Sequence, residues 1–119
     1  MKILMIDDNQ SITGMMSKFL TMKGHDVTVS NNSRNGLNLI IQQKFDVVLL
    51  DLAMPEFSGA DVIDALAQSG KIKDQKVMLF TASSVTDGDI ENLIKKGAHS
   101  VIKKPIGLNE LLTTLEAAK

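Results

Sequence analysis

Three short runs in which every residue is apolar limit the fold of this chain more than any other feature. They read ILMI from residue 3, VVLL from residue 47 and VMLF from residue 77. A strand with apolar side chains on both alternating faces is typical of a parallel sheet that helices cover on both sides. With two less uniform runs, the sequence predicts five strands, at residues 2–6, 26–30, 47–50, 76–80 and 100–102.

Between and after these strands the apolar residues follow a helical spacing. The pattern is clearest where Ile12, Met15, Met16, Phe19 and Leu20 occupy positions i, i+3, i+4, i+7 and i+8. Similar stripes mark four more helices, around residues 37–41, 63–67, 90–94 and 108–115. Right-handed crossovers between parallel strands place such helices on both faces of the sheet. We therefore predict one doubly wound α/β domain over residues 1–119.

The composition excludes several classes of protein. The chain has 119 residues, 44% of them hydrophobic, a formal charge of −1 and no cysteine. This length is enough for one domain to bury its own core, and the charge indicates neither a nucleic-acid nor a membrane surface. Apolar runs of about four residues are too short to span a bilayer. We expect a cytoplasmic protein that binds neither nucleic acid nor membrane.

Acidic residues stand where two of the predicted strands end. Asp7 and Asp8 follow the first strand, and Asp51 follows the third. Open α/β sheets bind their ligands beyond the carboxyl ends of the strands. Carboxylates gathered at that edge repel one another unless a cation lies between them. Magnesium binds carboxylate oxygens and keeps several waters, so the sequence predicts a magnesium site.

Two more side chains with suitable chemistry reach the same edge. Thr81 follows the fourth strand, and Lys104 follows the fifth, next to Pro105. A carboxylate nucleophile, a metal, a hydroxyl group and an ammonium group are the parts needed to hold a phosphoryl group. The predicted edge is therefore suited to phosphoryl transfer.

These residues resemble, in order and in position, the receiver domain of two-component response regulators. The resemblance covers essentially the whole chain and implies a flavodoxin-like sheet with strand order 2-1-3-4-5. The motifs that carry it are Asp7-Asp8, Asp51-Leu52-Ala53-Met54-Pro55 with Gly59, Thr81-Ala82, and Lys104-Pro105.

The resemblance implies a role for each site residue. Asp51 would accept a phosphoryl group from a histidine kinase or a phosphotransfer protein. Asp8, Asp51 and the backbone carbonyl of Ala53 would bind magnesium directly, and Asp7 would bind it through water. Lys104 and Thr81 would hold the phosphoryl oxygens. Such a domain is a signalling phosphoacceptor rather than an enzyme, although it assists its own phosphotransfer and dephosphorylation.

The resemblance also implies how the signal leaves the domain. In the family, Thr81 leads a shift of the following loop and helix, which changes the surface of the fourth helix, fifth strand and fifth helix for a downstream protein. The domain would be a monomer or a phosphorylation-dependent dimer.

The chain departs from the family pattern at several positions. The usual aromatic switch residue is here Val101, and Ile106, Ala53 and Ser83 also differ from the residues common in the family. The chain ends at Lys119, just after the last predicted helix, so we expect no output domain within it.

Three other classes of protein compete with this interpretation. A flavodoxin-type FMN binder needs a neutral phosphate loop where this chain has Asp7-Asp8-Asn9. A haloacid-dehalogenase-type phosphatase needs a second acid at position 53, which is alanine. A degenerate receiver that binds partners without phosphate stays open as the alternative. His25 and His99 are expected in exposed loops without a role.

Overall fold

A computed structural model describes residues 1–54, 56–81, 86–104 and 106–118 of the chain. Strands and helices alternate along the sequence, as the apolar pattern predicts. In this described part, no helix has the length and apolar character needed to cross a membrane. The elements are β1 (Lys2–Ile6), α1 (Gln10–Met22), β2 (Asp26–Ser30), α2 (Ser33–Gln42), β3 (Val47–Asp51), α3 (Gly59–Ser69), the 3-10 helix η1 (Lys71–Asp74), β4 (Val77–Thr81), α4 (Asp87–Lys96), β5 (Ser100–Lys103) and α5 (Leu108–Ala117).

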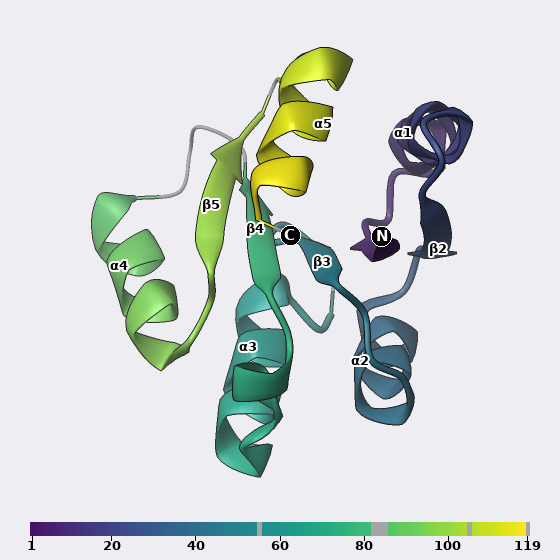
Figure 1. The fold of residues 1–119 in the computed structure, drawn as a ribbon. Coiled ribbons are helices and arrows are strands. Elements are labelled where there is room, and N and C mark those ends of the chain that lie inside the picture. The colour runs from purple at the N-terminus through teal and green to yellow at the C-terminus, as the bar shows by residue number, and fades with distance from the viewer. Residues whose placement is uncertain (55, 82–85, 105, 119) are drawn as a thin grey trace.

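The strands form one parallel sheet in the order β2-β1-β3-β4-β5. The predicted fold class and strand order are therefore confirmed. Figure 1 shows α1 and α5 on one face of this sheet and α2 and α3 on the other. Because all strands run in the same direction, their carboxyl ends meet at one edge, where the predicted site residues lie.

Alternate residues of each central strand enter different cores. In β3, Val48 and Leu50 pack with α2, α3 and α4, whereas Val47 and Leu49 pack with α1 and α5. All four are almost completely buried. The period-2 alternation of strand side chains thus explains why the run is apolar at every position.

Three strands extend further toward the site than their apolar residues indicate. β3 includes Asp51, β4 starts at Val77 and ends at Thr81, and β5 includes Lys103. The sheet continues there because Asp51 pairs with Phe80, and Thr81 pairs with Lys103. A strand predicted from apolar side chains stops at the last apolar residue, whereas backbone hydrogen bonds extend it through polar ones.

The expected exposure of His25 is wrong. Its side chain is buried, with 8% of the residue exposed, whereas His99 is exposed as expected. His25 Nδ1 lies 3.1 Å from the Met1 amine, and Nε2 lies 3.5 Å from the Glu116 carboxylate. Its position after Gly24 resembles a surface turn in the sequence, but the beginning of β1 and the end of α5 cover the ring.

The start of α3 packs directly on the backbone of the strand that carries Asp51. Ser58 and Asp61 form a capping box at this end of the helix. The Gly59 N–H donates to the Leu52 carbonyl at 3.3 Å. A Cβ at Gly59 would lie 2.5 Å from the Asp51 carbonyl oxygen and 2.8 Å from Leu52 Cα. Only a residue without a side chain allows this approach.

We therefore expect Gly59→Ala to destabilise the protein by about 1–3 kcal/mol, because backbone atoms cannot move aside as a flexible side chain can. Gly14→Ala is the matched control, since Gly14 lies inside α1 with nothing within 4 Å of its added Cβ. That change should stabilise the protein by up to about 1 kcal/mol. Urea unfolding measures both, and equal effects of the two variants would contradict the close packing at Gly59.

Candidate functional site

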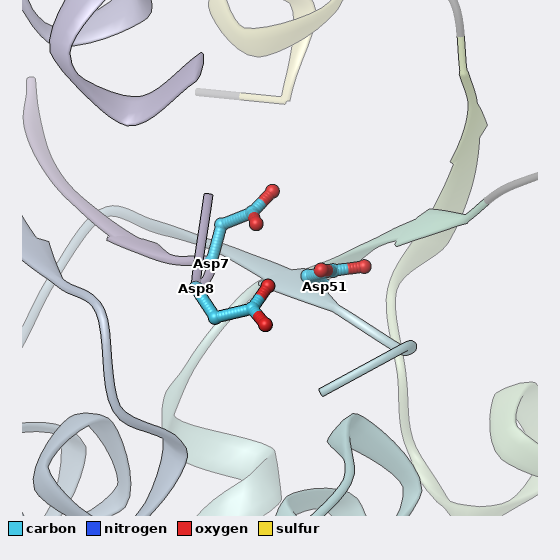
Figure 2. A group of neighbouring side chains, drawn as sticks. All are labelled: Asp7, Asp8 and Asp51. Atoms are coloured by element: carbon cyan, nitrogen blue, oxygen red, sulfur yellow. The ribbon is translucent and has the colours of Figure 1, made fainter. Parts of the chain in front are cut away.

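The three predicted acids lie together at the carboxyl edge of the sheet. Asp7 and Asp8 follow β1, and Asp51 is the last residue of the neighbouring strand β3. Each contributes a carboxylate oxygen to a group whose members all lie within 4.8 Å of one another. Figure 2 shows the three side chains beside one another at this edge. Asp7 and Asp51 are buried, whereas Asp8 is exposed.

Hydrogen bonds fix the Asp7 end of this group. The Asp7 N–H donates to the Ser30 carbonyl at 3.1 Å, and Asp7 Oδ1 accepts from the Asn9 N–H at 3.0 Å. The Asn31 amide donates to the Asp7 carbonyl at 2.7 Å and to Thr13 Oγ1 at 3.1 Å. Asn31 therefore ties the loop after β1 to the end of β2. Sequence reasoning missed it, and its only signal is a polar residue directly after a predicted strand.

Asp51 occupies an environment that disfavours its charged form. Burial, followed by the nearby Asp7 carboxylate, raises the pKa of Asp51 above its ordinary value of 3.8. The Ala53 N–H, which donates to Asp51 Oδ1 at 3.2 Å, and the Lys104 ammonium lower that pKa in part. Because the charged form of Asp51 is disfavoured in this environment, any further cation placed beside the carboxylate would stabilise it.

Lys104 brings the predicted positive charge to these acids. Its Nζ lies 3.1 Å from Asp7 Oδ2 and 3.5 Å from Asp51 Oδ1. Its backbone N–H donates to the Thr81 carbonyl at 2.7 Å, which places Lys104 directly beside the end of β4. Lys103, the neighbouring residue, is exposed. The ammonium thus joins the two buried carboxylates.

The other predicted site residues lie at the end of β4, in the loop after β3 and within β5. Thr81 ends β4 and is only 1% exposed, and Ala53 is exposed in the loop after β3. Val101 is half-buried in β5 and packs against the core shared with α3 and α4. Pro105, Ala82 and Ser83 lie outside the described residues.

The chemistry of the group fits a magnesium ion. Three carboxylates offer the hard oxygen ligands that magnesium prefers, and the exposed Asp8 leaves room for the waters that it keeps. Beside Asp8 lies a hollow of about 210 Å³, which Asn31, Arg34 and Met54 help to line. A small hydrated ion can therefore reach Asp8 from solvent.

Comparisons with known proteins agree with this geometry. The model of the response regulator receiver domain family matches residues 3–116. The probable transcriptional regulatory protein SilR of Salmonella typhimurium is 33% identical over 112 residues, which are 94% of this chain and 48% of SilR. Response regulator MprA of Mycolicibacterium vanbaalenii is 29% identical over 98% of this chain and 49% of its own length. The chain thus spans about half the length of the curated relatives it matches.

A solved structure shows the same likeness over almost the full length of both chains. The chemotaxis protein CheY4 of Vibrio cholerae is 25% identical, covers 99% of this chain and 98% of its own, and superposes with a TM-score of 0.87. Receiver domains are signalling modules, and the described part of this chain has an acidic group at the carboxyl edge of the sheet. The match of the family model over residues 3–116 shows that this chain belongs to the receiver domains of two-component response regulators.

Proposed function

We propose that this domain accepts a phosphoryl group on Asp51 from a histidine kinase or a phosphotransfer protein. The observation that carries the proposal is the position of Asp51, buried at the edge of the sheet with Asp7, Asp8 and Lys104 around its carboxylate. Membership of the receiver family supports the choice of donor. The expected cytoplasmic location and the absence of nucleic-acid binding stay predictions.

In the transfer step, a carboxylate oxygen of Asp51 attacks the phosphorus atom of the donor. A new P–O bond forms, and the P–N bond of a phosphohistidine breaks, with its electron pair leaving on the imidazole. A small acyl phosphate would instead lose a carboxylate. The domain provides the nucleophile and the positioning groups, so it assists this reaction without being a conventional enzyme.

Charge neutralisation is the main requirement of this step. Magnesium bound by Asp8, Asp51 and the Ala53 carbonyl directly, and by Asp7 through water, would offset negative charge on the carboxylates and the phosphoryl oxygens. Lys104 now contacts Asp7 and Asp51, and its flexible stem allows the ammonium to follow the incoming phosphoryl group. The Thr81 hydroxyl would donate one further hydrogen bond.

Output would pass from Thr81 to the surface formed by α4, β5 and α5. α4 has a single buried residue, Leu93, so little packing opposes its displacement. Val101, in place of the usual aromatic residue, has no ring to move between buried and exposed positions. A receiver that binds a partner without phosphate is the second candidate, and the substitution at position 101 is the observation that favours it.

The acceptor is tested by Asp51→Asn, which keeps the shape of the side chain and removes the nucleophile. We expect the wild type to gain one labile phosphoryl adduct from a small acyl phosphate with magnesium, and the variant to gain none while remaining folded. Mass spectrometry of both proteins measures this. No adduct on the folded wild type would favour the phosphate-independent receiver, and an equal adduct on the variant would place the acceptor elsewhere.

The magnesium site is tested through stability. Because the pKa of Asp51 is raised in the folded state, its ionisation destabilises the fold as the pH rises above 3.8 through the raised value. In EDTA at neutral pH, Asp51→Asn should therefore be more stable than the wild type, and this advantage should disappear as the pH falls toward 3.8.

Magnesium should stabilise the wild type by mass action and so reduce the difference in unfolding free energy between the wild type and Asp51→Asn. Asp8→Ala is the control, because it retains the burial of Asp51 but removes a direct ligand, so magnesium should leave its unfolding free energy unchanged. Urea unfolding at several pH values, with and without magnesium, measures these effects. Equal magnesium stabilisation of all three proteins would contradict the site.

Output is tested by comparing Thr81→Ala with Val101→Ala. We expect Thr81→Ala to weaken the dependence of partner binding on phosphorylation, because it removes the hydroxyl group that links the phosphoryl group to α4. Val101→Ala should change that coupling by less than about 1.4 kcal/mol, which is tenfold in affinity. Partner affinity is measured with and without an acyl-phosphate mimic. The reverse ranking of the two variants would show that output runs through β5.

A further inference from the structure

Lys104 has an aromatic neighbour that the family motifs do not include. Phe80, next to the last residue of β4, is 3% exposed and lies in the core shared with α1 and α5. The Lys104 Nζ lies 5.0 Å from the centroid of its ring. Phe80 also pairs with Asp51 across the sheet, and its carbonyl accepts the Leu52 N–H at 3.1 Å. The ring is therefore part of the structure that surrounds the predicted acceptor.

Among the described residues, the ammonium of Lys104 thus has partners of two kinds. One kind is the carboxylates of Asp7 and Asp51, and the other is the face of the Phe80 ring. A cation within about 6 Å of a ring centroid is attracted by the negative face of the ring, more strongly where water is partly excluded. The Lys104 side chain is 24% exposed, so the site is partly shielded from water.

Packing alone does not fix the lysine on this side. A hollow of about 210 Å³ lies along Lys104 and Phe80, and Ile12, Met16 and Ile106 help to line it. A long, flexible side chain beside an open hollow can adopt several rotamers. Restricting Lys104 to one of them costs conformational entropy. Among the described residues that line this hollow, Phe80 alone presents an aromatic face to the charge.

We propose that Phe80 is a positioning residue for phosphoryl transfer, holding the Lys104 ammonium at the carboxylate edge so that it can neutralise the incoming phosphoryl oxygens. This inference rests on the proposed function of Asp51. It assigns the effect to the electrostatics of the ring rather than to its volume. A leucine at position 80 would fill much of the same space but would present no negative face to the cation.

The test replaces Phe80 with phenylalanines carrying one, two, three and five ring fluorines. Fluorine withdraws electrons from the ring face while changing its shape little, so the attraction for Lys104 falls in steps. We expect the rate of acyl-phosphate formation with magnesium to fall stepwise, by about two- to fivefold at five fluorines. That range corresponds to an attraction of about 0.5–1 kcal/mol.

Phe45 provides a matched control within the same chain. It is 2% exposed, and Lys2 Nζ lies 5.1 Å from its ring centroid, but both residues are at the opposite edge of the sheet from Asp51. The same fluorine series at Phe45 should leave the rate of phosphorylation unchanged. The proposal would be overturned if fluorination lowered the phosphorylation rate equally at both positions, or if fluorination of Phe80 left that rate unchanged.

A second readout does not depend on phosphorylation. The Phe80 ring should shift the NMR signals of the Lys104 ε-methylene protons upfield, and Phe80→Leu should abolish this ring-current shift. If wild-type Asp51 takes no phosphate but the shift is present, the proposed function fails while the contact holds. If phosphorylation proceeds but the shift is absent, the positioning role of Phe80 is wrong and the function of Asp51 stands.

Discussion

Repulsion between carboxylates at the end of β1 and the end of β3 is the constraint on which the rest of the site depends. Asp7 and Asp51 are both buried, so water does little to weaken their interaction. Lys104 offsets part of this cost by contacting both. Burial, and after it the Asp7 charge, still raise the pKa of Asp51 above its ordinary value, so Lys104 compensates only in part. A further cation at this site would therefore stabilise the charged form of the carboxylates.

The sheet keeps these like charges close because its backbone leaves them little freedom. Hydrogen bonds cross from Leu52 to Phe80 and from Lys104 to Thr81, each just beyond a strand end. The pairing of β1 with β3 keeps Asp7 beside Asp51, and the pairing of β3 with β4 and of β4 with β5 places Lys104 near them. The two faces of the sheet pack against different helices. Val101 packs toward α3 and α4, and Phe80 packs toward α1 and α5.

The sequence predicted the strands, their order through a family resemblance, and the gathering of the acids, because all of these follow from local patterns. A fully apolar run ended by aspartate indicates both a buried strand and its polar end. The burial of His25, the link made by Asn31 and the contact of Phe80 with Lys104 depend on residues distant in sequence. Phe80 in particular reads as an ordinary core residue, since its apolar run gives no sign of the cation beside it.

The burial of Asp51 also affects how long an acyl phosphate on its side chain would last. An acyl phosphate is lost when water attacks its phosphorus, and the Asp51 side chain that would carry the phosphoryl group is only 7% exposed. Under the proposed function, the depth at which Asp51 lies would therefore influence both how fast the domain is phosphorylated and how long the phosphoryl group is retained.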